Sequence, residues 1–284
     1  MSLLKLAGAT VGLSPEDLED RKGYFNASTA PRIMGGNPKH VEQAWLEATG
    51  QKEPEDLSKN QAVLWGSWSE PLNAHIYTMT TGCSVGESGK VIKEDWLRCT
   101  LDGMTTYGDG YPAVFEAKHV SIGWKGEDEA TVIKQKVAYY MPQIHIQMWL
   151  ADVKWAVLSI FLNTNAGIKL HIVPVPFDEI YWVDVHRTCE AFWNAVQTKT
   201  PPEGVDAVQA PEIAEELRDV DMTGQNEWAA LAADWLETKT PAAVHKKSDK
   251  GIKELIEVDV GLAIGHGIQV KRAKNGSLRI GVTK

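Results

Sequence analysis

The sequence is poor in cysteine, and its cysteines are not arranged to bind zinc. The three cysteines of the 284-residue chain, Cys83, Cys99 and Cys189, lie far apart, which favours buried free thiols in a reducing compartment. No run of about 18 apolar residues occurs, so the sequence offers no membrane span. GxGxxG and Walker phosphate loops and a Ser-His-Asp signature are also missing, which argues against an ATP-driven motor or a serine hydrolase.

An excess of positive charge is missing too. The 38 acidic residues outnumber the 29 basic ones, and the net charge is −9. Proteins that coat nucleic acid without selectivity are basic, so that class is excluded. A local contact is not excluded, because salt screens surface charges beyond about 8–10 Å. The N-terminal segment becomes acidic soon after a short apolar start, which makes a poor signal peptide, and we expect a cytoplasmic protein.

The stretch from Arg98 to Val120 contains an acid, a turn-rich run and an apolar strand that ends in Glu-Ala-Lys. Strand residues alternate between faces, so Glu116 and Lys118 point the same way. A hairpin that turns at Gly108–Gly110 brings Asp102 beside Glu116. Two carboxylates and one ammonium on one face are the grouping that metal-assisted phosphodiester hydrolysis requires. The alternative is that these acids are surface charges.

Two predicted helices flank this stretch. A helix that starts near Gln61 contains Glu70, and its apolar residues recur about one turn apart, at Leu64, Trp65, Trp68, Leu72 and Ile76. A lone acid on a helix is usually a solvated charge, so Glu70 by itself predicts no site. A helix that starts at Pro142 places Gln143 and Gln147 on one face. The alternative is two satisfied glutamines on a partly exposed surface.

Near the N-terminus, Arg21 and Ser28 stand seven positions apart in the pattern R-x-G-x-x-x-A-S. One interpretation is that Ser28 caps a helix that begins near Thr29. The other is an anion site, because an arginine beside a helix N-terminus suits a phosphate. These residues alone leave both interpretations open.

The other patterns predict alternating strands and helices. Residues 155–162 are almost continuously apolar, which fits a central buried strand. A strand over 168–175 and a helix with one apolar stripe over 177–198 follow. We also expect helices over 39–50 and 131–140, and strands at 83–85 and 90–92.

Together these motifs resemble the PD-(D/E)XK nuclease core, and their flanks resemble the YqaJ-type viral recombinases, a family related to the phage lambda exonuclease. The resemblance covers about residues 20–200 and rests on motifs that occur in the family's order: Arg21–Ser28, Trp65–Ala74, Thr100–Gly103, Glu116–Lys118 and Tyr140–Met148. It implies an α/β fold, with a restriction-endonuclease-like core whose mixed central sheet is flanked by helices. The core would span residues 1–204, and residues 205–284 would form a small C-terminal α/β appendage.

The resemblance implies an activity and its partners. The family's enzymes are Mg²⁺-dependent exonucleases that digest double-stranded DNA from 5′ to 3′ and leave 3′ single strands for an annealing protein of the RecT or Redβ kind. Two Mg²⁺ ions are implied, for which Mn²⁺ would substitute. A homotrimer is implied as well, in the cytoplasm of a bacterial host, with a phage or prophage origin. The alternatives are a DNA endonuclease of the same superfamily and a non-catalytic protein that binds DNA ends.

The resemblance also implies residue roles. Asp102, Glu116 and the Ala117 backbone carbonyl would hold metal, with help from Glu70. Lys118 would be the catalytic lysine. Gln143 would lie close to Lys118 and the nucleophilic water, with Gln147 at the second position of a related motif, and Arg21 and Ser28 would bind the 5′-phosphate of the DNA end.

The appendage is acidic at its start and basic at its end. From His245 to Lys284 there are nine Lys and Arg residues against four acids, a net charge of +5. Helices over 227–238 and from 249 to about 263 are expected, and Asn275-Gly276 between two alternating runs predicts a hairpin. The appendage would be either a packing module or an additional surface for DNA or a partner.

Overall fold

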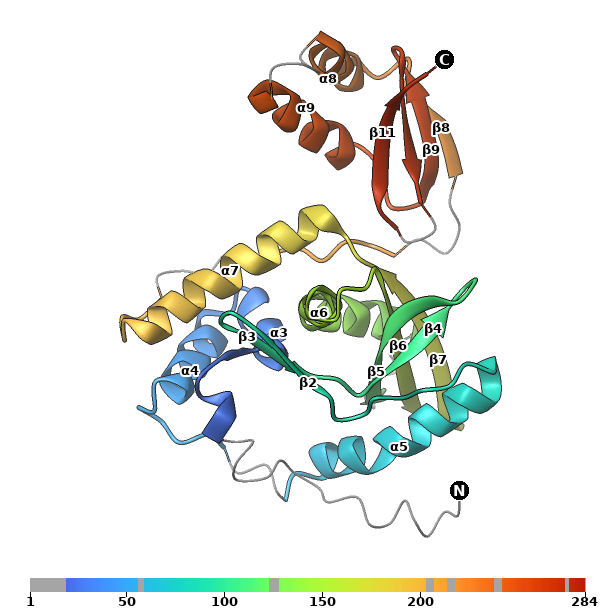
Figure 1. Ribbon diagram of the computed structural model, residues 1–284. Coiled ribbons are helices and arrows are strands. Elements are labelled where there is room, and N and C mark those ends of the chain that lie inside the picture. The colour runs from blue at the N-terminus through green and yellow to red at the C-terminus, as the bar shows by residue number, and fades with distance from the viewer. Residues whose placement is uncertain are drawn as a thin grey trace. The chain divides into compact units, whose positions relative to one another are not determined.

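The computed structural model of the protein describes residues 19–55, 59–122, 128–202, 207–213, 218–237, 242–273 and 276–283 (Figure 1). The chain divides into two compact units. The first comprises residues up to 175 together with 182–210, and the second comprises residues 176–181 and those from 211 onward. Every helix in the described part of the chain is too short or too polar to cross a membrane.

A four-stranded sheet, ordered β4-β5-β6-β7, forms the centre of the first unit. β4 (Gly103–Tyr107) is antiparallel to β5 (Tyr111–Ser121), and β6 (Trp155–Thr164) is parallel to β5, with β7 (Gly167–Pro176) at the edge. This mixed sheet confirms the predicted α/β core with a mixed central sheet, the hairpin and the buried strand at 155–162. Residues 156–162 are all buried, so both faces of the sheet must be covered.

Helices α5 (Gln61–Thr81) and α6 (Glu129–Leu150) cover opposite faces of this sheet (Figure 1). Consecutive residues of β5 point to opposite faces of the sheet. Phe115 packs against Tyr77 of α5, with ring centroids 5.0 Å apart. The next residue, Glu116, faces α6 and accepts a hydrogen bond from Gln143. The strand that carries the candidate catalytic residues is therefore enclosed between these two helices.

Helix α5 turns its polar side inward. Its buried residues are Ser69, Asn73 and Tyr77, spaced one turn apart, whereas Trp65 and Trp68 are 57% and 48% exposed. The apolar periodicity thus predicted the helix correctly but not the face that meets the sheet. Hydrogen bonds of Ser69 and Asn73 attach this helix to the sheet beside the apolar packing of Tyr77.

Helix α6 is continuous, and the predicted break before Pro142 is wrong. Asp128 caps its start by accepting the backbone N–H of Thr131 at 3.0 Å. Pro142 lies inside the helix, where a proline removes one backbone hydrogen bond. Residues 141–148 are nevertheless all buried, and this packing holds the helix together across the proline. Gln143 and Gln147 therefore share one face of a buried helix.

A second sheet of the first unit has the order β1-β3-β2. Its strands are β1 (Phe25–Asn26), β2 (Val91–Glu94) and β3 (Leu97–Thr100). The strand predicted at 83–85 does not form; next to this segment, Gly86 makes an isolated bridge with Met104 of β4, and the Ser84 carbonyl accepts a hydrogen bond from the Thr105 hydroxyl at 3.0 Å. The remaining helices are η1 (Ala27–Thr29), α3 (Ala30–Met34), α4 (Pro38–Ala48) and α7 (Glu179–Gln197).

The second unit packs helices α8 (Asn226–Glu237) and α9 (Ala242–Glu254) with a sheet ordered β11-β10-β9-β8. Its strands are β8 (Arg218–Asp221), β9 (Val260–Gly265), β10 (Ile268–Arg272) and β11 (Leu278–Val282). The helix predicted from 249 to about 263 is wrong beyond Glu254, because β9 pairs with both β8 and β10. The predicted C-terminal hairpin is confirmed as β10 and β11, although Lys274 and Asn275 lie outside the described residues.

Candidate active site

The β4–β5 hairpin places Asp102 at the level of Glu116, as predicted. The pairing of the two strands ends with Gly103 opposite Phe115, and Asp102 immediately precedes Gly103. The Asp102 Oδ2 atom then accepts the backbone N–H of Ala117 at 2.9 Å. The N–H and C=O groups of one strand residue leave on the same edge, so the Ala117 carbonyl lies on the Asp102 side as well.

Glu116 is the centre of the cluster, and its side chain is only 1% exposed. Its Oε1 atom accepts hydrogen bonds from Lys118 Nζ and from Gln143 Nε2, both at 2.5 Å. Its Oε2 atom accepts from Gln147 Nε2 at 2.7 Å. The structure thus brings both predicted glutamines to the carboxylate and confirms that Gln143 lies next to Lys118. Three donors, one of them charged, allow this carboxylate to be buried in its ionised form.

Lys118 lies between the carboxylates and an aromatic ring. Its Nζ atom is 4.9 Å from the centroid of the Tyr140 ring, and its side chain is 21% exposed. Burial lowers the pKa of Lys118, but the nearby Glu116 and Asp102 carboxylates outweigh burial, and the net result is a raised pKa. Sequence reasoning gave Tyr140 no role, although its place one turn before Gln143 on α6 was the available signal.

Glu70 and Asp102 crowd each other. Burial, then the charges of Glu116 and Glu70, raise the pKa of Asp102 well above its ordinary value. Burial of the carboxyl group also raises the pKa of Glu70, although the residue as a whole is exposed, and a hydrogen bond with Asp102 opposes this rise. A hydrogen bond between two carboxyl groups requires a proton on one of them. The structure therefore brings Glu70 to Asp102 from α5, on the other side of the sheet from the glutamines.

Asp102→Asn should raise the melting temperature of the metal-free protein at neutral pH. A carboxyl group whose pKa is higher in the folded chain binds protons better there, so its stabilising contribution is complete below the unfolded pKa and is lost as pH rises. Asparagine removes the charge and keeps an oxygen for the Ala117 N–H. Thermal unfolding in EDTA should show equal melting temperatures in acid and a growing advantage for the variant as the pH rises.

The exposed Glu42 on α4 supplies the control for this measurement. Glu42→Gln also removes one carboxylate, but from an exposed position, where substitutions usually change stability by less than about 0.5 kcal/mol. If Asp102→Asn melts at or below the wild-type temperature at neutral pH, that result contradicts the repulsion of the Asp102 carboxylate by Glu116 and Glu70.

The donor set fits a divalent cation. Among the described residues, no three His, Cys, Asp or Glu side chains stand ready as a metal cage, since both oxygens of Glu116 are turned to Lys118 and the glutamines. Burial nevertheless raises the pKa values of both the Glu70 and the Asp102 carboxyl groups, and the neighbouring Glu116 charge adds to this. A hard cation with oxygen ligands would offset the cost of holding these groups together in their charged forms. Asp102, Glu116, Glu70 and the Ala117 carbonyl are the residues suited to hold it.

Arg21 and Ser28 are in contact: Arg21 Nη2 donates to Ser28 Oγ at 3.0 Å. Ser28 lies in η1, and the N-cap of the following helix α3 is Thr29, so the interpretation of Ser28 as a helix cap is wrong. η1 packs against α6, the helix that carries the two glutamines.

Arg98 is a buried arginine that sequence reasoning missed. Only 1% of its side chain is exposed, and its Nε atom donates to Asp20 Oδ2 at 3.1 Å. Its Nη1 atom donates to Thr100 Oγ1 at 3.2 Å. Asp20 directly precedes Arg21, so Arg98 anchors the backbone that presents Arg21. An arginine inside a short strand gives no sequence signal for such a role.

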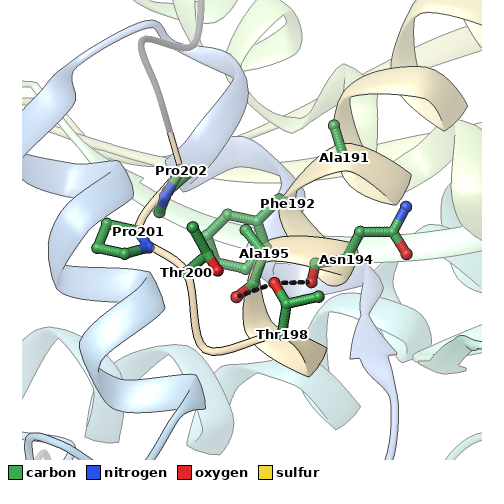
Figure 2. Close-up of a pocket in the computed structure, with 8 residues that line it drawn as sticks. All are labelled: Ala191, Phe192, Asn194, Ala195, Thr198, Thr200, Pro201 and Pro202. Carbon is green, nitrogen blue, oxygen red and sulfur yellow. Dashed lines mark hydrogen bonds between the residues drawn. The ribbon is translucent and has the colours of Figure 1, made fainter.

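A pocket elsewhere in the first unit contains none of these residues. It lies at the end of α7, where Phe192, Thr198 and Pro201 are among the residues that line it (Figure 2). Thr198 Oγ1 donates to the Asn194 carbonyl at 2.8 Å within this pocket. All of its lining side chains are uncharged, so the pocket lacks the chemistry of the carboxylate cluster.

Comparisons with known proteins show what the chain is similar to. Residues 18–154 match the family model of the YqaJ-like viral recombinase domain. Among solved structures, the chain is similar to an alkaline exonuclease from Laribacter hongkongensis (16% identity, TM-score 0.49, 66% of this chain and 94% of that chain covered). A phage-related exonuclease from Haemophilus somnus is also similar (14% identity, TM-score 0.45, 63% and 93% covered). No curated protein matches. The carboxylates, the lysine and both glutamines described above all lie within residues 18–154, the stretch that matches this family model.

Proposed function

We propose that this protein is a metal-dependent exonuclease that digests double-stranded DNA from its 5′ ends and leaves 3′ single strands. One observation carries the proposal: three carboxyl groups and one ammonium group meet at a single strand, β5, inside a YqaJ-like domain. Phosphodiester hydrolysis needs that combination, because negative charge develops on the phosphate while a water attacks.

Asp102, Glu116 and the Ala117 carbonyl are the proposed ligands of the first Mg²⁺ ion, and Glu70 helps to hold a second. When bound, Mg²⁺ or Mn²⁺ would neutralise charge on the phosphate and lower the pKa of a bound water. Carboxylate and carbonyl oxygens are the ligands that both ions prefer. The raised pKa values of Glu70 and Asp102 support this assignment, because burial and neighbouring carboxylates make a nearby positive charge favourable there.

Lys118 and Gln143 act on the attacking water and on the phosphate. The raised pKa of Lys118 keeps its ammonium group charged, so we assign it positioning of the water and stabilisation of developing charge in preference to proton abstraction. Gln143 donates to the same Glu116 oxygen as Lys118 and is placed to orient the same water. Gln147 fixes the other oxygen of Glu116.

The test is digestion of linear duplex DNA labelled at either end, with and without Mg²⁺, by the wild type and Asp102→Asn. We expect metal-dependent release of the 5′ label from linear DNA by the wild type only, and no cutting of a closed circle. A cut circle would make the protein an endonuclease of the same superfamily. End binding without cleavage in any metal would make it a binding protein.

Arg21 and Ser28 are the proposed binding site for the 5′-phosphate. A guanidinium held by a neighbouring hydroxyl is a rigid donor pair for phosphate, and their contact at 3.0 Å supports the assignment. Arg21→Ala should lower the rate on 5′-phosphorylated ends about ten- to hundredfold, the value of a charge-assisted hydrogen bond. The rate on 5′-hydroxyl ends should not change.

The neighbouring Lys22 provides the matched control for Arg21. It is exposed and forms an ion pair with Glu19 at 2.6 Å, so Lys22→Ala removes one positive charge from the same segment. This variant should keep the wild-type preference for phosphorylated ends. If both variants lose the same fraction of the rate on phosphorylated ends, Arg21 contributes only general electrostatic attraction and does not bind the 5′-phosphate.

We further propose the assembly that the resemblance implies. Residues 1–204 would be the exonuclease core of a homotrimer, and residues 205–284 an appendage for contact with DNA or a partner. The 3′ single strands would pass to an annealing protein of the RecT or Redβ kind in the cytoplasm of a bacterial host. The net charge of +5 from His245 to Lys284 supports a contact with DNA by the appendage, in a chain that is acidic as a whole.

A further inference from the structure

Two side-chain contacts attach α5 to the central sheet. The first joins Ser69 to His119 on β5, with Oγ and Nδ1 3.0 Å apart. The second joins Asn73 to Ser159 on β6: Asn73 Nδ2 donates to the Ser159 carbonyl at 3.0 Å, and Ser159 Oγ donates to Asn73 Oδ1 at 2.5 Å. Ser69, Asn73 and Ser159 are 5%, 1% and 0% exposed. The second contact is therefore shielded from water, where hydrogen bonds are strong and unpaired groups are costly, and the first is partly shielded, because His119 is half-buried.

These contacts lie next to the candidate catalytic residues. Ser69 directly precedes Glu70, and His119 directly follows Lys118, so one hydrogen bond links the backbone positions that carry both groups. Ser159 pairs with Ala117 in the β5–β6 register, and the Ala117 N–H holds Asp102. The second contact therefore joins α5 to the part of the sheet that positions Asp102.

Hydrogen bonds fix the position of a helix along a sheet more strictly than apolar packing does. An apolar face tolerates small displacements, whereas donors and acceptors must meet within a few tenths of an ångström. A slip of α5 by one turn would move it about 5.4 Å and leave the buried amide and hydroxyl groups unpaired. The inward polar face of α5 accordingly selects one register, and this register places Glu70 against Asp102.

We propose that the Ser69–His119 and Asn73–Ser159 contacts are positioning contacts that set the register of α5 and thereby deliver Glu70 to the metal site. The four residues act through Glu70 and do not touch the reacting atoms. The inference rests on the proposed function in one respect, the assignment of Glu70 as a metal ligand.

The protonation state of His119 does not decide the first contact. The Ser69 hydroxyl donates to the Gly66 carbonyl at 3.0 Å, so His119 Nδ1–H is the donor to Ser69 Oγ. Both the neutral Nδ1–H form and the charged form of the ring supply this hydrogen. The contact is therefore a fixed structural link and not a pH switch.

Metal binding measured without catalysis tests the proposal. The rise in melting temperature on titration with Mg²⁺ should require about ten- to hundredfold more metal in Ser69→Ala and in Asn73→Ala than in the wild type, the usual cost of losing support behind a metal ligand. Ser69→Thr keeps the hydroxyl and should restore most of the wild-type response. Thr80→Ala is the matched control, because the Thr80 hydroxyl bonds only to the Ile76 carbonyl within α5.

Cleavage and DNA binding supply the second readout. In the alanine variants the rate should approach the wild-type value at high Mg²⁺, and affinity for DNA ends in EDTA should stay unchanged. A uniform loss of rate at all Mg²⁺ concentrations, or a wild-type metal response in both variants, would overturn the proposal. If Ser69→Ala does not fold, His119→Ala removes the same bond from the sheet side, and the same metal shift is expected of it.

The result separates this inference from the proposed function. A wild-type protein whose melting temperature does not respond to Mg²⁺ and that cuts no DNA refutes the proposed function itself. A wild-type protein that responds and cuts, with alanine variants that respond equally well, refutes only the positioning role.

Discussion

Glu116→Gln should lower the rate of DNA cleavage by about a thousandfold or more. Glu116 is the one side chain that contacts Lys118, Gln143 and Gln147 together, and it is a proposed metal ligand. Glutamine keeps the shape but removes the charge, and it turns an amide N–H₂ toward groups that are themselves donors. Groups that act as a unit are lost together, so the effect should approach that of removing the whole cluster. The measurement is single-turnover cleavage at saturating Mg²⁺.

The same variant should also be less stable, by about 3–5 kcal/mol, because it leaves the buried Lys118 ammonium without its carboxylate. This sign is opposite to that expected for Asp102→Asn in metal-free protein. Both changes remove one carboxylate from the same cluster. The Glu116 carboxylate accepts three hydrogen bonds, whereas the Asp102 carboxylate lies near the like charges of Glu116 and Glu70. Glu116→Asp keeps the charge and should recover part of both losses, while Glu129→Gln, at an exposed pair with Lys169, should change neither. Equal stability changes at Glu116 and Asp102 would contradict this picture.

Lys118→Gln should lower the cleavage rate by about a hundred- to a thousandfold, the usual effect of removing one preorganised group that stabilises the transition state. If Lys118 stabilises charge as an ammonium group, raising the pH should not restore the variant and should not reveal a lysine titration in the wild-type rate near neutrality. The raised pKa of Lys118 in the metal-free protein favours that outcome. Rates measured from pH 6 to about 9 at saturating metal would decide.

Two further variants separate charge from position at Lys118. Lys118→Arg keeps the positive charge but replaces a compact ammonium by a planar fork, so it should recover only part of the rate. Lys169→Gln removes an exposed lysine that pairs with Glu129 and should leave the rate unchanged. The wild-type cleavage rate could instead rise with pH in the basic range, and this rise could be absent from Lys118→Gln. That result would make Lys118 the general base.

The sequence predicted the central hairpin and the helical segments that carry Glu70 and the two glutamines because their signals are local, although it broke the second helix before Pro142. Gly108 and Gly110 mark the turn, and both adopt the positive φ angles, 58° and 92°, that favour glycine. Strand alternation then put Glu116 and Lys118 on one side, and the i, i+4 spacing put Gln143 and Gln147 on another helix facing them. The proposed roles of Glu70, Arg21 and Ser28 came from the family resemblance, because their spacing alone also fitted a solvated acid on a helix and a helix cap.

Features that depend on distant contacts could not be predicted in this way. The inward face of α5 is polar because Ser69 and Asn73 find partners on β5 and β6, 50 and 86 residues further along the chain. The β9 strand exists because β8 and β10 lie on either side of it. Pro142 remains helical because its surroundings are buried on all sides. In each case tertiary contacts override a local preference.

In such an enzyme, the buried Arg98 would help to set the distance between the bound DNA end and the cutting point. Through Asp20 it secures the residue next to Arg21, and four residues further along the same chain lies Asp102. The proposed binding site for the DNA end is thus attached to β3, and the proposed cutting point lies two residues beyond the end of this strand, so a short stretch of chain sets the interval between them. Fragments cut against a fixed interval are uniform in size, whereas an end that swings freely yields mixed products. A variant in which Asp20 is held less firmly should therefore change the length of the DNA fragments that are released as well as the rate of cleavage.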